Sequence, residues 1–187
     1  MSRTSLVAAL GLAWVPAQAV AASATGAAAA DIISPIAVRQ IRDLDFGVLA
    51  ANAESAGSVR IAPGGPGAIY GGSAHSACAP PTPCLSPHFA RFEVSGEANR
   101  AYTIAAPAHV SVAGEQVGDG PAPRFAPPLV VIDDIQIRSA SRPDASRAGW
   151  LNSAGRDSFD LGGTLRLPAA TPPAHFRISF EVIVTYS

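Results

Sequence analysis

The strongest constraint on the fold is a run of apolar residues at every second position near the end of the chain. The run comprises Phe176, Ile178, Phe180, Val182, Val184 and Tyr186. Alternate side chains of a β-strand share one face, whereas a helix would scatter these residues around its circumference. The pattern therefore predicts one long strand over residues 175–187 with a buried apolar face.

Shorter runs of the same kind recur upstream, separated by turns. Residues 90–94 alternate cleanly, and residues 129–137 form a longer run with a predicted inward face of Leu129, Val131, Ile135 and Ile137. The chain has 17 Gly and 17 Pro, which is typical of short strands joined by turns. We find no amphipathic helix, so we expect a single all-β domain, an immunoglobulin-like antiparallel β-sandwich.

The predicted core combines the alternating residues of several strands. It comprises Phe46, Phe92, Val94, Tyr102, Ile104, Leu161, Leu165, Phe176, Ile178, Phe180, Val182 and Val184. The pair Gly162-Gly163 predicts a break between Leu161 and Leu165, because glycine weakens a strand interior.

The first residues have the features of a secretory signal peptide. Arg3 precedes an apolar run over residues 6–15, and Ala17-Gln18-Ala19 supplies the small residues of a cleavage site. The run is about half the ~20 residues needed to span a bilayer. We expect residues 1–19 to be a signal peptide, 20–30 a flexible leader and 31–187 the sandwich domain. The exported protein would not span a membrane and would reside in the periplasm, at the cell surface or outside the cell.

The expected export of the chain also affects the chemistry predicted for its two cysteines. Cys78 and Cys84 are expected to form a disulfide, because an exported chain meets an oxidising compartment. His75 and His88 flank them, so the four side chains resemble a tetrahedral zinc site. The spacing matches no common zinc motif, and we favour the disulfide, which would shape one short loop.

Several function classes are disfavoured by the sequence. The net charge is −1 and no basic patch is visible, so we expect no nucleic-acid partner. Asp133 and Asp134 would lie on opposite faces of a strand and could not act as an acid/base pair; a bulge, a strand end or a hydrogen-bonded core position would explain Asp133. No nucleophile elbow or nucleotide-binding glycine loop occurs, so we expect no enzyme, metal or cofactor. Trp150 is expected to cap the core; the alternative is an exposed ring that stacks on a ligand.

Six short motifs occur in a characteristic order along the chain. They are Leu44-Asp45-Phe46-Gly47, Gly71-Gly72, Ala90-x-Phe92-x-Val94-x-Gly96, Tyr102-Thr103-Ile104, Leu161-Gly162-Gly163-Thr164-Leu165 and Phe180-x-Val182-x-Val184-x-Tyr186. Together they resemble the secreted bacterial family called domain of unknown function 4402, over residues 31–187. That family is regarded as similar to pilins and spore-coat-type fimbrial subunits and has no agreed catalytic residues. The resemblance implies a pilin-like surface subunit with protein partners, either copies of itself or other subunits. The Cys78–Cys84 loop and the proline-rich segment 121–128 depart from the family pattern.

A pilin is an incomplete sandwich whose groove accepts a strand from the next subunit. Under that hypothesis, segment 31–41 would donate the strand through Ile32, Ile36 and Val38, and the acceptor groove would be bordered by Phe180, Val182, Val184 and Tyr186. The alternative is that segment 31–41 pairs within its own domain, at an edge because Pro35 lacks a backbone donor.

A second function also remains open from the sequence. The protein could be a monomeric secreted or periplasmic module that binds a ligand with the loops at residues 71–88 and 139–158. A stable monomer with a complete sheet would favour this hypothesis over assembly.

Overall fold

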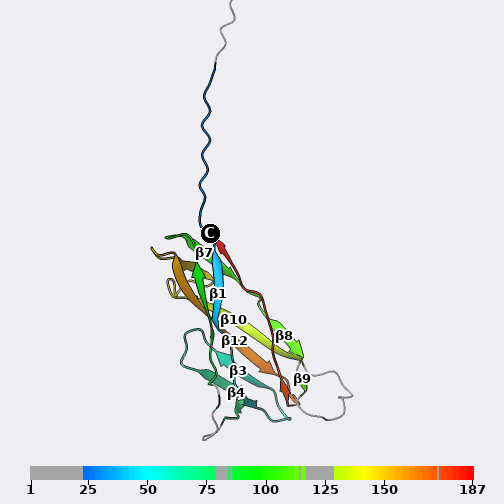
Figure 1. Cartoon of the computed structure of the whole chain (residues 1–187). Helices are drawn as coiled ribbons and strands as arrows, with labels where there is room; N and C mark the ends of the chain where they lie inside the picture. Colours follow the sequence, from blue (N-terminus) through cyan, green and yellow to red (C-terminus); the bar gives the residue numbers. More distant parts are fainter. Residues whose placement is uncertain (1–22, 79–83, 85, 114, 117–128, 172) are drawn as a thin grey trace, which may run out of the picture. The chain divides into compact units, whose positions relative to one another are not determined.

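A computed structural model of the chain describes residues 23–78, 84, 86–113, 115–116, 129–171 and 173–187. The predicted signal peptide and the proline-rich segment 121–128 lie outside the described residues. The chain divides into two units at Ile32 and Ile33. Residues 23–32 contain no helix or strand, and their side chains are exposed. In the second unit, residues 33–187, all regular structure that is described is β-strand (Figure 1).

The larger sheet has seven strands. They are β1 (Ala37–Arg42), β3 (Gly57–Ile61), β4 (Ala68–Gly72), β6 (Ala90–Ser95), β8 (Val110–Ala113), β10 (Leu129–Ser139) and β12 (Arg156–Leu167). The long strand β12 is central: β10 pairs along one side, while β6 and β3 share the other side. The sheet continues from β6 to β1, from β3 to β4 and from β10 to β8, with every pairing antiparallel.

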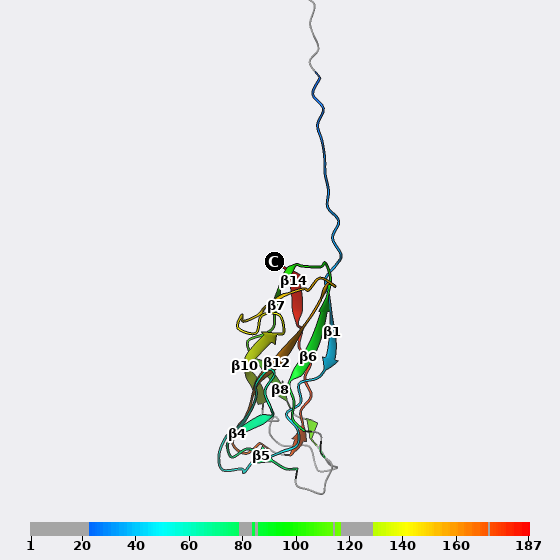
Figure 2. The same ribbon diagram turned by 90° about the vertical axis from the view of Figure 1, so that its left-hand side faces the viewer.

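A second sheet of three strands completes the main framework (Figure 2). Its order is β11 (Ala148–Trp150), β7 (Ala101–Ala105) and β14 (Ile183–Tyr186). Two small pairs join β2 (Leu49–Ala50) to β5 (His75–Ser76), and β9 (Glu115–Gln116) to β13 (Ala174–His175). The fold is thus all-β and antiparallel, as predicted for a β-sandwich; the immunoglobulin-like topology stays a prediction.

Both main sheets contribute to one hydrophobic core. Phe92 of β6 stacks on Phe159 of β12 with ring centroids 4.9 Å apart, and Tyr102 enters from β7. Half of the predicted core is buried as expected: Phe92, Val94, Tyr102, Ile104, Leu161 and Leu165. The other half is only partly buried and packs at the periphery of the core: Phe46, Phe176, Ile178, Phe180, Val182 and Val184.

A bulge in β10 changes which of its residues face the core. Asp133 pairs with Thr164 and Gln136 with Gly162, so β10 carries one residue more than β12 between these pairs. Asp134 lies at the bulge with a left-handed φ of +50°. A bulge near Asp133 was among the predicted explanations and is confirmed. The predicted inward face of Leu129 and Val131 is wrong, because the extra residue shifts the alternation; the buried residues there are Val130 and Ile132.

The predicted break at Gly162-Gly163 is also wrong, because β12 runs through both glycines. A Cβ on Gly162 would lie 2.1 Å from the carbonyl oxygen of Ile61, and one on Gly163 would lie 3.2 Å from Cγ2 of Ile132. Two glycines therefore allow β3 and β10 to approach β12 closely from either side.

Candidate functional site

The C-terminal segment combines the predicted alternation with an incomplete strand. Its even-numbered side chains from Phe176 to Tyr186 are half-buried against the core, and the odd-numbered ones are exposed, as predicted. Only Ile183–Tyr186 form a strand, however, and residues 176–182 pair with no strand in the described part of the chain. The prediction of one long strand is therefore wrong for residues 176–182. The ladder stops because its partner β7 ends at Ala105, which pairs with Ile183.

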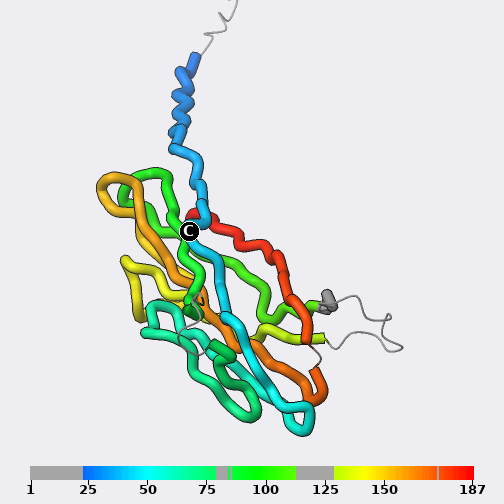
Figure 3. The backbone as a smooth tube through the Cα atoms, turned by 60° about the horizontal axis from the view of Figure 1, so that its bottom comes forward, coloured from blue at the N-terminus to red at the C-terminus, as the bar shows by residue number. Residues whose placement is uncertain are grey.

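Two sheet edges near this segment are open among the described residues. β14 pairs with β7 alone, and β1 pairs with β6 alone. Figures 1 and 3 show that β1 and the C-terminal segment come together near the C-terminus and then diverge. An open edge presents a row of backbone N–H and C=O groups that can pair with another strand.

Tyr186 ties the two edges together where they meet. Its hydroxyl accepts a hydrogen bond from the backbone N–H of Glu97 (2.6 Å) and donates one to the carbonyl of Ser34 (2.7 Å). Gly96 makes room for this contact, since a Cβ there would lie 2.3 Å from the Tyr186 hydroxyl oxygen. Tyr186, one of the predicted acceptor-side residues, therefore links β14 to the segments that precede β1 and follow β6.

The three candidate donor residues lie in different environments. Val38 is part of β1 and pairs with Val94, and Ile36 is partly buried against the core. Pairing within the domain, the alternative interpretation of segment 31–41, is thus what Ala37–Arg42 adopt, and they form an edge strand. Ile32 lies outside the folded unit and is 98% exposed.

The cysteines form the predicted disulfide. Cys78 and Cys84 are joined with their Cα atoms 5.9 Å apart. Nδ1 of His75 lies 3.2 Å from the carbonyl oxygen of Ser73, and Nδ1 of His88 lies 3.1 Å from that of Asp43. Because the sulfurs are bonded to each other, the zinc alternative loses the two thiolates on which it depended.

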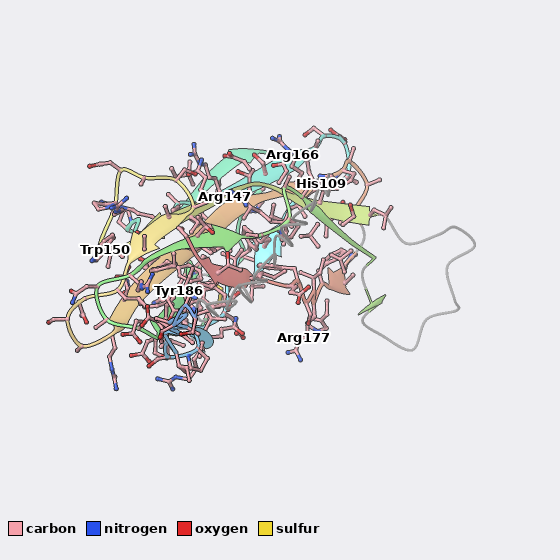
Figure 4. The ribbon with its side chains drawn as sticks, turned by 90° about the horizontal axis from the view of Figure 1, so that it is seen from above. His109, Arg147, Trp150, Arg166, Arg177 and Tyr186 are labelled. Atoms are coloured by element: carbon pink, nitrogen blue, oxygen red, sulfur yellow. A yellow bond between two sulfur atoms is a disulfide. The ribbon has the colours of Figure 1, made fainter. Side chains whose placement is uncertain are left out.

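Trp150 lines a shallow cavity, so the expectation that it caps the core is wrong. The cavity has a volume of about 660 Å³ and lies among side chains of β1, β6, the start of β12 and residues 140–152. The indole is 40% exposed, and Figure 4 shows Trp150 at the margin of the sandwich. The preceding residue, Gly149, explains the exposure of Trp150. A Cβ on Gly149 would lie 2.3 Å from the ring of Tyr102, so this ring occupies the core side of the strand at Gly149. Trp150, next in the strand, points to the opposite face.

Tyr102 connects the core to the residues of this cavity. Its hydroxyl donates a 2.8 Å hydrogen bond to Oδ2 of Asp157, which also accepts one from the hydroxyl of Ser141. Burial, together with the hydrogen bond to Asp157, raises the pKa of Tyr102 above its ordinary value. Asp157 and Ser141 both line the cavity, so this network fixes part of its floor.

Replacing Tyr102 by phenylalanine is expected to lower the free energy of unfolding by about 1–2 kcal/mol near neutral pH, because the ring still packs but the hydrogen bond is lost. The pKa of Tyr102 is raised in the folded state, so its hydroxyl contributes fully below the unfolded pKa of about 10 and progressively less above it. The difference between wild type and variant should therefore shrink as the pH rises from about 9 to about 11. Urea unfolding across this range measures it, and a constant difference would contradict the assignment.

The adjacent carboxylates Asp133 and Asp134 have separate partners. Asp133 forms an ion pair with Arg166, whereas Asp134 accepts hydrogen bonds from the side-chain amide of Gln136 at 3.2 Å. Asp134 also lies 3.9 Å from the guanidinium of Arg60 on β3, so the two carboxylates have different partners on the larger sheet.

These features define a class: an antiparallel all-β domain with one short disulfide loop and, among the described residues, open sheet edges at β1 and β14 beside the C-terminal segment. The family model described as Domain of unknown function (DUF4402) matches residues 36–186, which include every strand from β1 to β14. The chain therefore belongs to this family. No curated protein and no solved structure matched the chain in the corresponding comparisons. Within the described residues, no helix is long and apolar enough to cross a membrane.

Proposed function

We propose that this protein is a secreted surface subunit that assembles by strand donation, with the leader of one copy pairing along the open C-terminal segment of the next. The observation that carries the proposal is the state of residues 176–182. Their even-numbered side chains are half-buried, yet they pair with no strand among the described residues. A sandwich that accepts a strand from another copy would have a segment in this condition.

A donated strand would satisfy both the backbone and the side chains of this segment. Each new backbone hydrogen bond contributes about 0.5–1.5 kcal/mol, and each Å² of apolar surface removed from water contributes about 25 cal/mol. The half-buried residues Phe176, Ile178 and Phe180 still have apolar surface to bury. A strand laid beside them would therefore add several favourable contacts at once.

Residues 23–33 are the proposed donor. Residues 23–32 contain no strand and are exposed, and Ile32 is 98% exposed. In the phase of Ile32 every residue is small or apolar, whereas the opposite phase holds the polar residues Ser23, Thr25 and Asp31 besides Ala27, Ala29 and Ile33. Asp31 falls in the opposite phase and would face solvent in a paired strand. Segments 23–33 and 176–186 contain equal numbers of residues, so their extended lengths match.

Deletion of residues 20–32 tests the proposal. The deletion leaves β1 intact because that strand begins at Ala37, and it leaves Ser34 to bind Tyr186. We expect the mature chain, from residue 20, to form multimers in light scattering and filaments in electron micrographs, and the deleted chain to remain a folded monomer. Equal assembly of both chains would contradict strand donation. A mature chain that stays monomeric at high concentration would favour the alternative, a monomeric binding module.

A further inference from the structure

We propose that the Trp150 cavity binds an acidic saccharide, that is, a pyranose sugar that carries a carboxylate. The volume of about 660 Å³ lies within the ~300–1,000 Å³ range of small-molecule sites. The lining side chains come from the larger sheet and residues 140–152, and none belongs to the C-terminal segment used in assembly. The inference is therefore independent of the proposed function.

Trp150 supplies an apolar wall, and its backbone is anchored to the cavity. Its backbone N–H donates a 2.8 Å hydrogen bond to Oγ of Ser141, and the guanidinium of Arg142 lies 5.5 Å from the centroid of its ring. One edge of a pyranose ring is polar, but its C–H face is apolar and flat. An exposed, oriented indole rimmed by polar groups is suited to stack against such a face.

Ile41 adds a second apolar wall through a bulge in β1. Gln40 pairs with Phe92 and Arg42 with Arg91, so Ile41 is the extra residue on β1. Its exposed side chain lines the cavity together with Trp150. Bulges often reorient a side chain beside a functional site, and this one places an apolar residue among charged neighbours.

The polar lining favours a carboxylate on the sugar. Three arginines, Arg39, Arg91 and Arg156, line the cavity with Glu93 and Asp157. Arg91 is held by both carboxylate oxygens of Asp160, which leaves Arg39 and Arg156 as the candidate anion-binding groups. Glu93 orients these two, since its carboxylate lies 2.8 Å from Arg39 and 3.6 Å from Arg156. Both guanidinium groups are largely exposed and have more N–H donors than Glu93 can accept from, so a ligand carboxylate can accept hydrogen bonds from them. Oδ1 of Asn152 accepts hydrogen bonds from the backbone N–H groups of Ala154 and Arg156, so its NH₂ group is the part that can bind a sugar hydroxyl.

The test is a binding screen with the mature protein, residues 20–187. The probes are oligosaccharides of galacturonate, glucuronate, mannuronate and sialic acid, each with a neutral counterpart of equal length. Trp150 is the one tryptophan in the sequence of residues 20–187, so the tryptophan fluorescence of this protein reports on the cavity. We expect at least one acidic probe to give a saturable change, with affinity at least tenfold above that of its neutral counterpart.

Calorimetry with variants then locates the site. Trp150→Ala should abolish binding of the acidic probe, and Arg156→Gln should weaken it at least tenfold. Arg60→Gln, on an exposed part of β3 outside the cavity, should leave the affinity unchanged. No saturable binding by any acidic probe, equal binding of neutral probes, or unchanged affinity in Trp150→Ala would each overturn the proposal.

Discussion

Replacing Leu161 by alanine is expected to lower the free energy of unfolding by about 2–5 kcal/mol. Leu161 is fully buried in β12, between Ile137 of β10 and Ala90 of β6. Strands on both sides limit how far the surroundings can collapse into the space left by the side chain. Urea denaturation followed by circular dichroism measures the loss, which would be a large part of the ~5–15 kcal/mol typical of a domain.

Leu129→Ala is the matched control for this experiment. Sequence periodicity places both leucines on inward faces, but Leu129 is 57% exposed because of the bulge in β10. Its replacement should change the free energy of unfolding by no more than about 0.5 kcal/mol. Equal losses in the two variants would contradict the described packing of β10 and β12.

Replacing Ile32 by aspartate is expected to reduce assembly at least tenfold. In the proposed assembly Ile32 would enter an apolar groove, where an unpaired carboxylate carries a large desolvation cost. Residue 32 lies outside the folded unit, so the variant should unfold like the wild type. Sedimentation velocity measures the multimers. Ile69→Asp, at an isoleucine of β4 that is 65% exposed, is the control and should assemble normally.

Mixing two defective chains sharpens this prediction. Ile32→Asp leaves the acceptor segment intact, whereas Phe180→Asp leaves the leader intact and adds a charge beside the half-buried face of the C-terminal segment. Each variant alone should remain monomeric, and the mixture should form a heterodimer that grows no further. Free assembly of either variant alone, or no complex in the mixture, would contradict donation between copies.

Local alternation was sufficient to predict much of the fold. The phase of Phe92 and Val94, of Tyr102 and Ile104, and of the tail from Phe176 was correct, because each strand keeps an unbroken period of two. The phase of β10 at Leu129 was predicted wrongly. A bulge near Asp133 was only one of several explanations, because Asp134 adopts a left-handed φ without the glycine that usually signals one. Gly162-Gly163 resembled a break because the close approach of β3 and β10 depends on distant partners.

The candidate sites were less predictable for the same reason. The sequence indicated that Tyr186 borders an acceptor groove, but its contacts with Ser34 and Glu97 join segments far apart in the chain. The cavity depends on a bulge at Ile41 and on Gly149, which turns Trp150 outward. The sequence around the bulge and around Gly149 contains no local signal that would have predicted an exposed tryptophan instead of one that caps the core.

The central claim is that residues 176–182, which pair with no strand among the described residues, gain a strand partner from another copy. Amide hydrogen exchange measures this directly in the monomer that lacks residues 20–32, before and after addition of a peptide with the sequence of residues 20–33. The account predicts fast exchange over residues 176–182 in the free monomer and strong protection with the peptide, while Phe159 and Leu161 stay protected throughout. Slow exchange of residues 176–182 in the free monomer, or no change with saturating peptide, would contradict it.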